Sequence, residues 1–220
     1  MLLLGFDTAT EVTTVALVRA GDDGVSHVLG ERSHRDARRH GEVLPVQIDE
    51  ILRDAEVGPS DVDAVAVGVG PGAYTGLRVG LATADALGLA LAVPIHGAST
   101  HDVLAFATQR ERPFAVVTDA RRRELFWSTY RTFDSRLSPP QVGTPDAVRA
   151  ALDGLDVVVP PGTPGIEGLH VRPGEAPSAV ALCRLVLSRL ADGQVTDRPE
   201  PIYLRRPDVM PAAPPKSVLS

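Results

Sequence analysis

The sequence predicts an α/β fold with mixed β-sheets. Three strand-like runs open the chain, and the turn at residues 21–24, Gly-Asp-Asp-Gly, is typical of a β-hairpin. Apolar runs of strand length then alternate with stretches of helical periodicity, an order typical of α/β proteins. Because the opening strands are expected to be antiparallel, the sheet should be mixed rather than wholly parallel.

The longest periodic elements lie in the first half of the chain. A helix is indicated where apolar residues recur three and four positions apart, and Pro45 is compatible with its first turn. Thr75 is expected to cap the next helix, which follows a Gly-Pro-Gly turn. The expected strands are 2–6, 12–18, 25–33, 62–69 and 93–96, and the expected helices are 41–55, 76–91 and 99–109.

The rest of the chain is organised around the stretch 65–91, a buried strand, a turn and an almost wholly apolar helix. A helix of this composition is buried on more than one side, but its Arg and Asp and its short length argue against a membrane span. One side is expected to lie on the sheet, and the other could meet a partner protein. Small residues, suited to either contact, recur every four positions: Gly76, Gly80, Ala84 and Gly88.

The second half repeats the alternation in weaker form. Each half begins with a strand that ends in an aspartate, Asp7 and Asp119, which suggests an internal duplication. The predicted domains are 1–107, 108–206 and a mobile proline-rich tail, 207–220. The expected strands are 114–118, 124–132 and 155–159, the expected helices are 146–152 and 177–192, and the stretch 160–177, dense in Pro and Gly, is expected to be loop.

Composition narrows the class of protein. The 220 residues carry a net charge of −6, which argues against a protein that grips nucleic acid over its whole surface. The basic stretches 32–40 and 121–123 are either solvated surface or contacts for RNA phosphates. The one cysteine, Cys183, is expected to be a small core residue. Without a signal peptide or a span, a cytoplasmic location is expected, with no membrane partner.

Motifs for catalysis are incomplete. The glycine-rich turn at 68–76 lacks the Lys of a Walker loop, so its glycines are expected to serve tight turns. Asp7, Thr8 and Thr10 resemble the first phosphate loop of actin-like ATPases, but Ala9 replaces the Gly of that loop and its Cβ would crowd a phosphate. The loop is therefore expected to be degenerate. None of the six histidines has an i, i+4 partner, which disfavours a metal site.

Several segments together resemble the TsaB (YeaZ) family, which is needed to make threonylcarbamoyladenosine in tRNA. The most specific is GPGAYTGLRVG at 70–80. The others are RRHGEVLPVQIDEIL at 38–52, PIHGAST at 94–100, TDARRRELFWSTY at 118–130 and PIYLRRPDV at 201–209. The resemblance implies a two-lobed actin-like fold, of the ASKHA and ribonuclease H-like type. In the catalytic paralogue, TsaD, two metal-binding histidines stand four apart, where this chain has Thr100 and Leu104.

The resemblance also implies a non-catalytic scaffold with no cofactor and no metal. Such a protein supports the TsaD-like subunit that modifies adenosine 37 of tRNAs reading codons that begin with A, and a TsaE-like ATPase belongs to the same complex. It pairs with TsaD, or with itself when TsaD is absent, and meets tRNA only indirectly. The residues predicted for the paired helices are Val43, Leu44, Val46, Gln47, Glu50, Tyr74, Arg78, Leu81, Ala82 and Asp85.

Two other classes of protein stay open at this point. One is an active enzyme of the same fold, an ATP-binding kinase or a metalloprotease. The kinase would need a working phosphate loop, and the metalloprotease would need the paired histidines. The other is a homodimer with a regulatory function.

Overall fold

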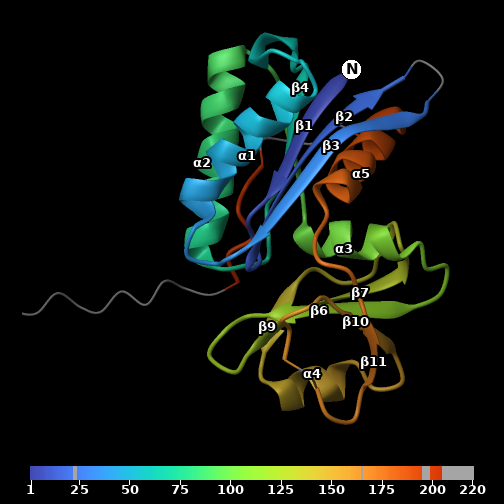
Figure 1. Cartoon of the computed structure of the whole chain (residues 1–220). Coiled ribbons are helices and arrows are strands. Elements are labelled where there is room, and N and C mark those ends of the chain that lie inside the picture. The colour runs from blue at the N-terminus through green and yellow to red at the C-terminus, as the bar shows by residue number, and fades with distance from the viewer. Residues whose placement is uncertain (22–23, 165, 195–198, 205–220) are drawn as a thin grey trace, which may run out of the picture.

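The computed structural model describes residues 1–21, 24–164, 166–194 and 199–204. Two β-sheets lie one beyond the other along the molecule (Figure 1). In the first sheet the strand order is β3-β2-β1-β4-β5, and β1 pairs antiparallel with β2 but parallel with β4. This sheet consists of β1 (Leu2–Asp7), β2 (Val12–Ala20), β3 (Ser26–Arg35), β4 (Ala64–Gly68) and β5 (Ile95–Ala98).

The second sheet repeats the topology of the first. Its order is β11-β10-β6-β7-β8, with β6 antiparallel to β7 and parallel to β10, so β6 occupies the place of β1. This agreement supports the predicted internal duplication. The strands are β6 (Phe114–Asp119), β7 (Leu125–Thr132), β8 (Ser135–Arg136), β9 (Gln141–Gly143, paired with β7), β10 (Asp156–Val159) and β11 (His170–Pro173).

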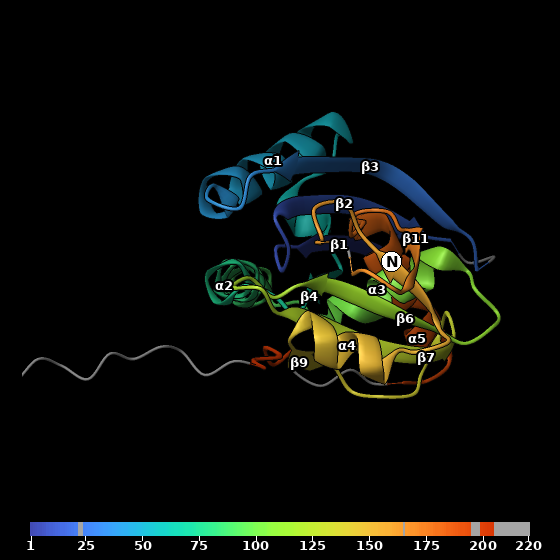
Figure 2. The ribbon, with the colours of Figure 1, turned by 90° about the horizontal axis from the view of Figure 1, so that it is seen from below.

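Helices cover both faces of the first sheet. On one face lie α1 (His40–Asp54) and α2 (Tyr74–Leu91), and on the other lies α5 (Ala179–Ala191), as Figure 2 shows. The helix α3 (Thr100–Thr108) contacts α5 and strands of the second sheet, so it joins the two halves. The short helix α4 (Pro145–Ala151) packs on the second sheet, and a 3-10 turn, η1 (Pro59–Asp61), precedes β4.

The core explains why β1 is buried along its whole length and apolar up to Asp7. Leu4 and Phe6 belong to the cluster under α1 and α2, whereas Leu3 belongs to the cluster under α5. Gly5 also faces α5, where a Cβ would overlap the sulfur of Cys183. Cys183 is fully buried, as expected, and burial raises its thiol pKa.

The stripe of small residues on α2 faces the sheet. A Cβ on Gly76 would overlap the carbonyl oxygen of Thr8, and one on Gly80 would lie 2.6 Å from Thr8 Oγ1. A Cβ on Gly88 would lie 2.6 Å from Ile95. The stripe therefore serves close contact within the chain, which is one of the two alternatives that the sequence left open for it.

Four expectations about the elements need correction. The stretch 160–177 is not all loop, because it contains β11, whose four residues are all exposed and so give no apolar pattern. The strands β8 and β9 are too short to have been predicted. The helix α2 begins at Tyr74 after Ala73, so Thr75 lies inside it and does not cap it. Finally, α5 packs on the first sheet although its residues belong to the second predicted domain.

The domain boundaries stay a prediction, and the tail 207–220 lies outside the described residues. Within the described ranges, no helix combines the length and the hydropathy needed to cross a membrane.

The packing of α2 predicts opposite effects for two glycine substitutions. Gly76→Ala should destabilise the protein by about 1–3 kcal/mol, because overpacking against the Thr8 carbonyl outweighs the helix propensity of Ala. Gly41→Ala should be neutral or stabilising by up to about 1 kcal/mol, since its Cβ would lie 3.9 Å from Val79. Urea unfolding followed by circular dichroism measures both. Equal stabilities would contradict the inward orientation of the stripe.

Candidate functional site

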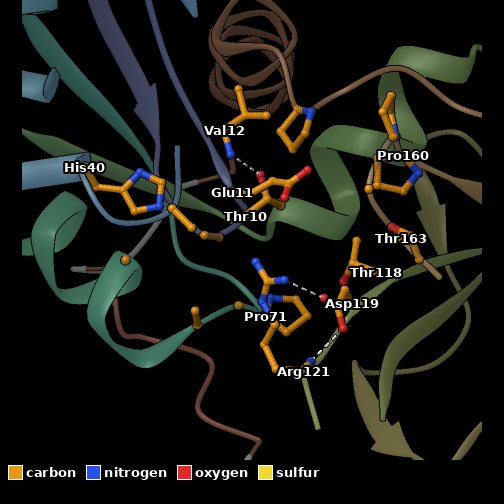
Figure 3. A pocket seen from close by; sticks show the side chains of 18 of the residues that line it. Thr10, Glu11, Val12, His40, Pro71, Thr118, Asp119, Arg121, Pro160 and Thr163 are labelled. Carbon is orange, nitrogen blue, oxygen red and sulfur yellow. Dashed lines mark hydrogen bonds and ion pairs between the residues drawn. The ribbon is translucent and has the colours of Figure 1, made fainter. Parts of the chain in front are cut away.

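A pocket of about 240 Å³ lies between the two halves of the chain (Figure 3). Its lining includes Thr10 and Glu11 after β1, and Thr118 and Asp119 at the end of β6. The turn at 71–76 and the loop at 160–163 contribute further to the lining, as does His40. The corresponding strands β1 and β6 therefore bring the residues at their carboxyl ends to the same pocket.

Asp7 lies behind this pocket and is held by the chain itself. Its Oδ1 accepts a hydrogen bond from the amide of Ala9 at 2.7 Å, and its Oδ2 accepts one from Thr100 Oγ1 at 2.8 Å. Burial raises the pKa of this carboxyl group. Gly68 is needed beside it, because a Cβ there would overlap the carboxylate. Asp7 is therefore fixed as a structural group, with each oxygen already bonded.

The rest of the predicted phosphate loop is also bonded within the chain. Thr8 Oγ1 donates to the carbonyl oxygen of Gly76 at 2.7 Å, and the amide of Ala73 donates to the carbonyl oxygen of Ala9 at 3.2 Å. A Cβ on Gly72 would overlap that Ala9 carbonyl. Of the three predicted loop residues only Thr10 lines the pocket, and its hydroxyl accepts from the amide of Val12. The turn thus occupies the space beside the loop.

Asp119, at the end of β6, has the same backbone hydrogen bond as Asp7 but different side-chain neighbours. The amide of Arg121 donates to Asp119 Oδ1 at 2.7 Å, as Ala9 does to Asp7. The Arg121 guanidinium also pairs with Asp119 Oδ2 at 3.0 Å, as Figure 3 shows. Unlike Asp7, Asp119 faces the pocket, but it does so as one half of an ion pair.

Two buried histidines flank the pocket without forming a metal site. His40 Nδ1 lies 2.6 Å from Thr13 Oγ1, and burial lowers the pKa of His40. His101 lies between Ser128 Oγ and Thr118 Oγ1, 2.8 Å from each, and its burial lowers its pKa to about 3. The sequence placed His40 in the basic stretch 32–40 and in the family-like segment 38–52, but indicated no role for its side chain. No group of three His, Cys, Asp or Glu residues that could hold a metal ion occurs in the described part of the chain.

Thr100 and Leu104, which stand where the resemblance places the metal-binding histidines of the catalytic paralogue, do not fit a metal site. Thr100 donates its hydroxyl hydrogen to Asp7, and Leu104 is a buried apolar residue. His101, the nearest histidine, has both ring nitrogens engaged by hydroxyl groups. These side chains offer no free ligand at the two positions.

The outer faces of α1 and α2 form a second candidate site. Leu89 of α2 is 87% exposed and Val46 of α1 is 54% exposed, high values for large apolar side chains. Of the exposed residues of α2, Arg78 is the one that carries a charge. The exposed residues are Tyr74, Thr75, Arg78, Ala82, Ala86, Leu89 and Ala90.

The structure divides the ten predicted interface residues into three groups. Val46, Tyr74, Arg78 and Ala82 are exposed, and Val43, Glu50, Leu81 and Asp85 are partly buried. Leu44 is fully buried and Gln47 is nearly so, which means that neither presents a surface to a partner.

Leu44 and Gln47 face the fold and not the outer surface of α1, an orientation that helical spacing alone did not give. Glu50 also forms an ion pair with Arg32 of β3, at 3.4 Å, on the side of α1 that faces the sheet edge. Ala86 and Leu89 were missed, although they follow Ala82 at helical spacings of four and seven.

Comparison with known proteins identifies the family. A family model described as TsaD, tRNA N6-adenosine threonylcarbamoyltransferase, matches residues 27–171. A protein of Escherichia coli named tRNA threonylcarbamoyladenosine biosynthesis protein TsaB is 30% identical over 226 residues, covering 93% of this chain and 95% of its own length. The chain belongs to the TsaB family.

Two mycobacterial members are more similar in sequence than the Escherichia coli TsaB. An uncharacterised protein of Mycobacterium tuberculosis is 40% identical over 96% of this chain and 95% of its own length. One of Mycobacterium leprae is 38% identical over 96% of this chain, which spans only 56% of that relative. Their names carry no function.

Solved structures confirm the fold that the resemblance implied. YeaZ from Pseudomonas aeruginosa matches with a TM-score of 0.74 and 28% identity, over 92% of this chain and 99% of its own. The ethanolamine utilization protein EutJ from Carboxydothermus hydrogenoformans matches at a TM-score of 0.52 and 12% identity, over 85% of this chain and 89% of its own, which concerns the fold alone. The TsaB-family chain therefore has the two-lobed ASKHA, ribonuclease H-like architecture.

Asp7 is predicted to be a structural group that works better uncharged. Asp7→Asn keeps an oxygen for the Ala9 amide, and its NH2 group donates to Thr100 Oγ1 in a bond of reversed direction. It also removes a buried charge. Its free energy of unfolding at pH 7 should equal or exceed that of the wild type in urea titrations. Asp7→Ala leaves two buried donors unpaired and should lose about 2–4 kcal/mol. Strong destabilisation by Asn would show that the ionised carboxylate is required.

Because burial lowers the pKa of His101, we predict that the protein loses stability in mild acid. Its native pKa of about 3 lies below the value of 6.5 expected when unfolded, so the unfolded chain binds more protons between these limits. Stability is therefore present above pH 6.5 and falls as the pH is lowered, by about 2 kcal/mol at pH 5 from this group. Urea titrations at pH 7 and pH 5 measure it. His101→Gln should reduce the difference, and the exposed His170→Gln should not; equal pH dependence in both variants would contradict this role.

Proposed function

We propose that this chain is a non-catalytic scaffold subunit in the formation of N6-threonylcarbamoyladenosine at position 37 of tRNAs that read codons beginning with A. It pairs with a TsaD-like catalytic subunit through the outer faces of α1 and α2. A TsaE-like ATPase joins the same cytoplasmic complex, and tRNA is met indirectly. Without the catalytic subunit, the chain pairs with a second copy of itself.

The observation that carries this proposal is the outer face of α2, where Arg78 is the one charged side chain among the exposed residues. An 18-residue helix is about 27 Å long, and α1 beside it widens the surface. Stable interfaces bury on the order of 1,200–2,000 Å² in total, with apolar residues at their centre. Such a centre is provided on α2 by Leu89, Ala86 and Ala82. On α1, Val46 provides an apolar contact.

The proposed interface differs from the one predicted from sequence. Its centre consists of the exposed residues Val46, Tyr74, Arg78, Ala82, Ala86 and Leu89. Val43, Glu50, Leu81 and Asp85 are proposed as its flanks, and Leu44 and Gln47 support it from within the fold.

The pocket supports a scaffold rather than an enzyme. The carboxylate of Asp7 and the hydroxyl of Thr8 are bonded to the chain, and the turn at 70–76 closes against the loop that would hold a phosphate. A kinase needs these groups free for nucleotide and metal. Nothing at this site favours the kinase or the metalloprotease over the scaffold.

A double substitution on the outer face of α2 tests the pairing. Ala82→Glu with Ala86→Glu places two charges in the centre of the proposed interface, where burial of unpaired charge opposes association. The variant should lose both self-pairing and binding to the TsaD-like subunit. Light scattering after size exclusion measures this on each protein alone and on the mixture. The variant should remain folded with an unchanged thermal midpoint, because both side chains are exposed.

The matched control carries the same charges at the same spacing on α4. Ala147→Glu with Ala151→Glu lies on exposed positions of that helix and should leave pairing intact. If the α2 variant still pairs, the interface is elsewhere. If the wild type fails to bind the catalytic subunit and instead binds ATP with micromolar affinity, the scaffold proposal is wrong and an enzyme takes its place.

A further inference from the structure

Two tyrosines and an arginine form a cluster where α2 begins. The rings of Tyr74 and Tyr203 lie 5.1 Å apart between centroids. Arg78, one turn along α2, places its guanidinium carbon 5.2 Å from the Tyr74 ring centroid and donates from Nη1 to the Tyr74 hydroxyl at 3.0 Å. Tyr74, Tyr203 and Arg78 are nevertheless all exposed.

The chain fixes Tyr203 at this place by anchoring the segment 199–204. The amide of Ile202 donates to the carbonyl oxygen of Val69 at 2.9 Å, at the end of β4. Pro199 packs on Gly97, where an added Cβ would lie 2.6 Å from the proline ring. The segment thus runs from β5 to the start of α2 and brings an aromatic ring from near the end of the sequence onto the face that α2 presents.

The charge of Arg78 is not neutralised by the described part of the chain. At α1, by contrast, two exposed arginines are paired with carboxylates of the helix: Arg39, which precedes it, with Glu42 at 2.9 Å, and Arg53 with Asp49. Arg78 has the Tyr74 hydroxyl and ring but no carboxylate partner among the described residues. Stacking holds its planar guanidinium in one orientation and leaves its other N–H groups available to a partner.

We propose that Tyr74, Arg78 and Tyr203 form a preorganised site that binds a carboxylate side chain of the catalytic subunit. This inference rests on the proposed function and names the chemistry of one contact in that interface. Guanidinium and carboxylate pair with fixed geometry, and Tyr and Arg are the residue types that contribute most to binding at interfaces. The site adjoins Ala82 one turn later, so the same partner surface covers both.

A carboxylate fits this site better than an RNA phosphate. Phosphate backbones are bound by several cations in a row, because affinity comes from releasing many counterions. Arg78 is the one charged side chain among the exposed residues of α2, and the chain as a whole has a net charge of −6. The two tyrosine rings and the uncharged face that follows suit a protein surface.

Binding measurements with the purified TsaD-like subunit test the site. Arg78→Gln should weaken the complex about tenfold or more, the loss expected for a central interface arginine. Arg78→Lys should weaken it as well, because an ammonium group does not reproduce the stacked, bidentate geometry. Tyr203→Ala should weaken it less, because it removes the support and keeps the charge. Arg149→Gln on α4 is the matched control and should bind as the wild type does.

The ionic strength dependence separates charge pairing from a purely structural role. Wild-type affinity should fall as salt is raised, and Arg78→Gln should show a flatter dependence. If the wild type binds the catalytic subunit and Arg78→Gln binds equally well, this site is wrong while the proposed function stands. If Arg78→Gln instead weakens binding of tRNA alone and leaves the protein complex unchanged, the ligand is a phosphate and the carboxylate is overturned. Failure of the wild type to bind the catalytic subunit overturns the proposed function and this site together.

Discussion

The close approach of two backbones, the loop at 7–10 and the turn at 70–76, is the constraint on which the rest of this structure depends. Gly72 and Gly76 leave no room for a side chain between them and the carbonyls of Ala9 and Thr8. The contact closes the loop that a nucleotide-binding relative would keep open. It also sets the rotation of α2 about its axis, so that the stripe of small residues faces inward and Leu89 faces solvent. The closed loop at 7–10 and the exposed outer face of α2 are therefore consequences of the same packing.

A second set of contacts joins the two halves through α3. His101 bonds to hydroxyls on β6 and β7, and Asp102 accepts from Tyr130 at 2.9 Å. Arg136 and Arg189 also donate to that carboxylate, from the second sheet and from α5. A buried carboxylate that is fully paired is costly to separate from its partners, because the unpaired charge would be left in a medium of low polarity. These bonds oppose opening of the pocket and suit a protein that presents a fixed surface.

The strands and helices could be predicted from the sequence where the apolar pattern reflects burial, and could not be predicted where it does not. The strands β1, β4 and β6 are buried apolar runs and were predicted, whereas β11 is fully exposed and gave no pattern. The stripe on α2 has the same spacing whether it meets a sheet or a partner, so only the contacts of Thr8 decide between them. In the same way, Leu44 and Val46 are both apolar residues of α1, and the sequence does not tell them apart. The rotation of α1 against the sheet buries Leu44 and exposes Val46. Tyr203 could not be placed beside Tyr74 from sequence, because 129 positions separate them.

The two halves share a sheet topology but differ in the helices that connect their strands. In the first half, α2 connects β4 to β5, and in the second the stretch 160–169 connects the corresponding strands β10 and β11. The described residues of that stretch form no helix, and Pro160 and Thr163 instead line the pocket. The counterpart of the 15-residue α1 is the seven-residue α4. Both halves have the sheet, which each core requires, whereas a long helix with a mostly uncharged outer face occurs on the first half and not in the described part of the second. The pairing proposed above therefore uses a surface that the described part of the second half does not repeat.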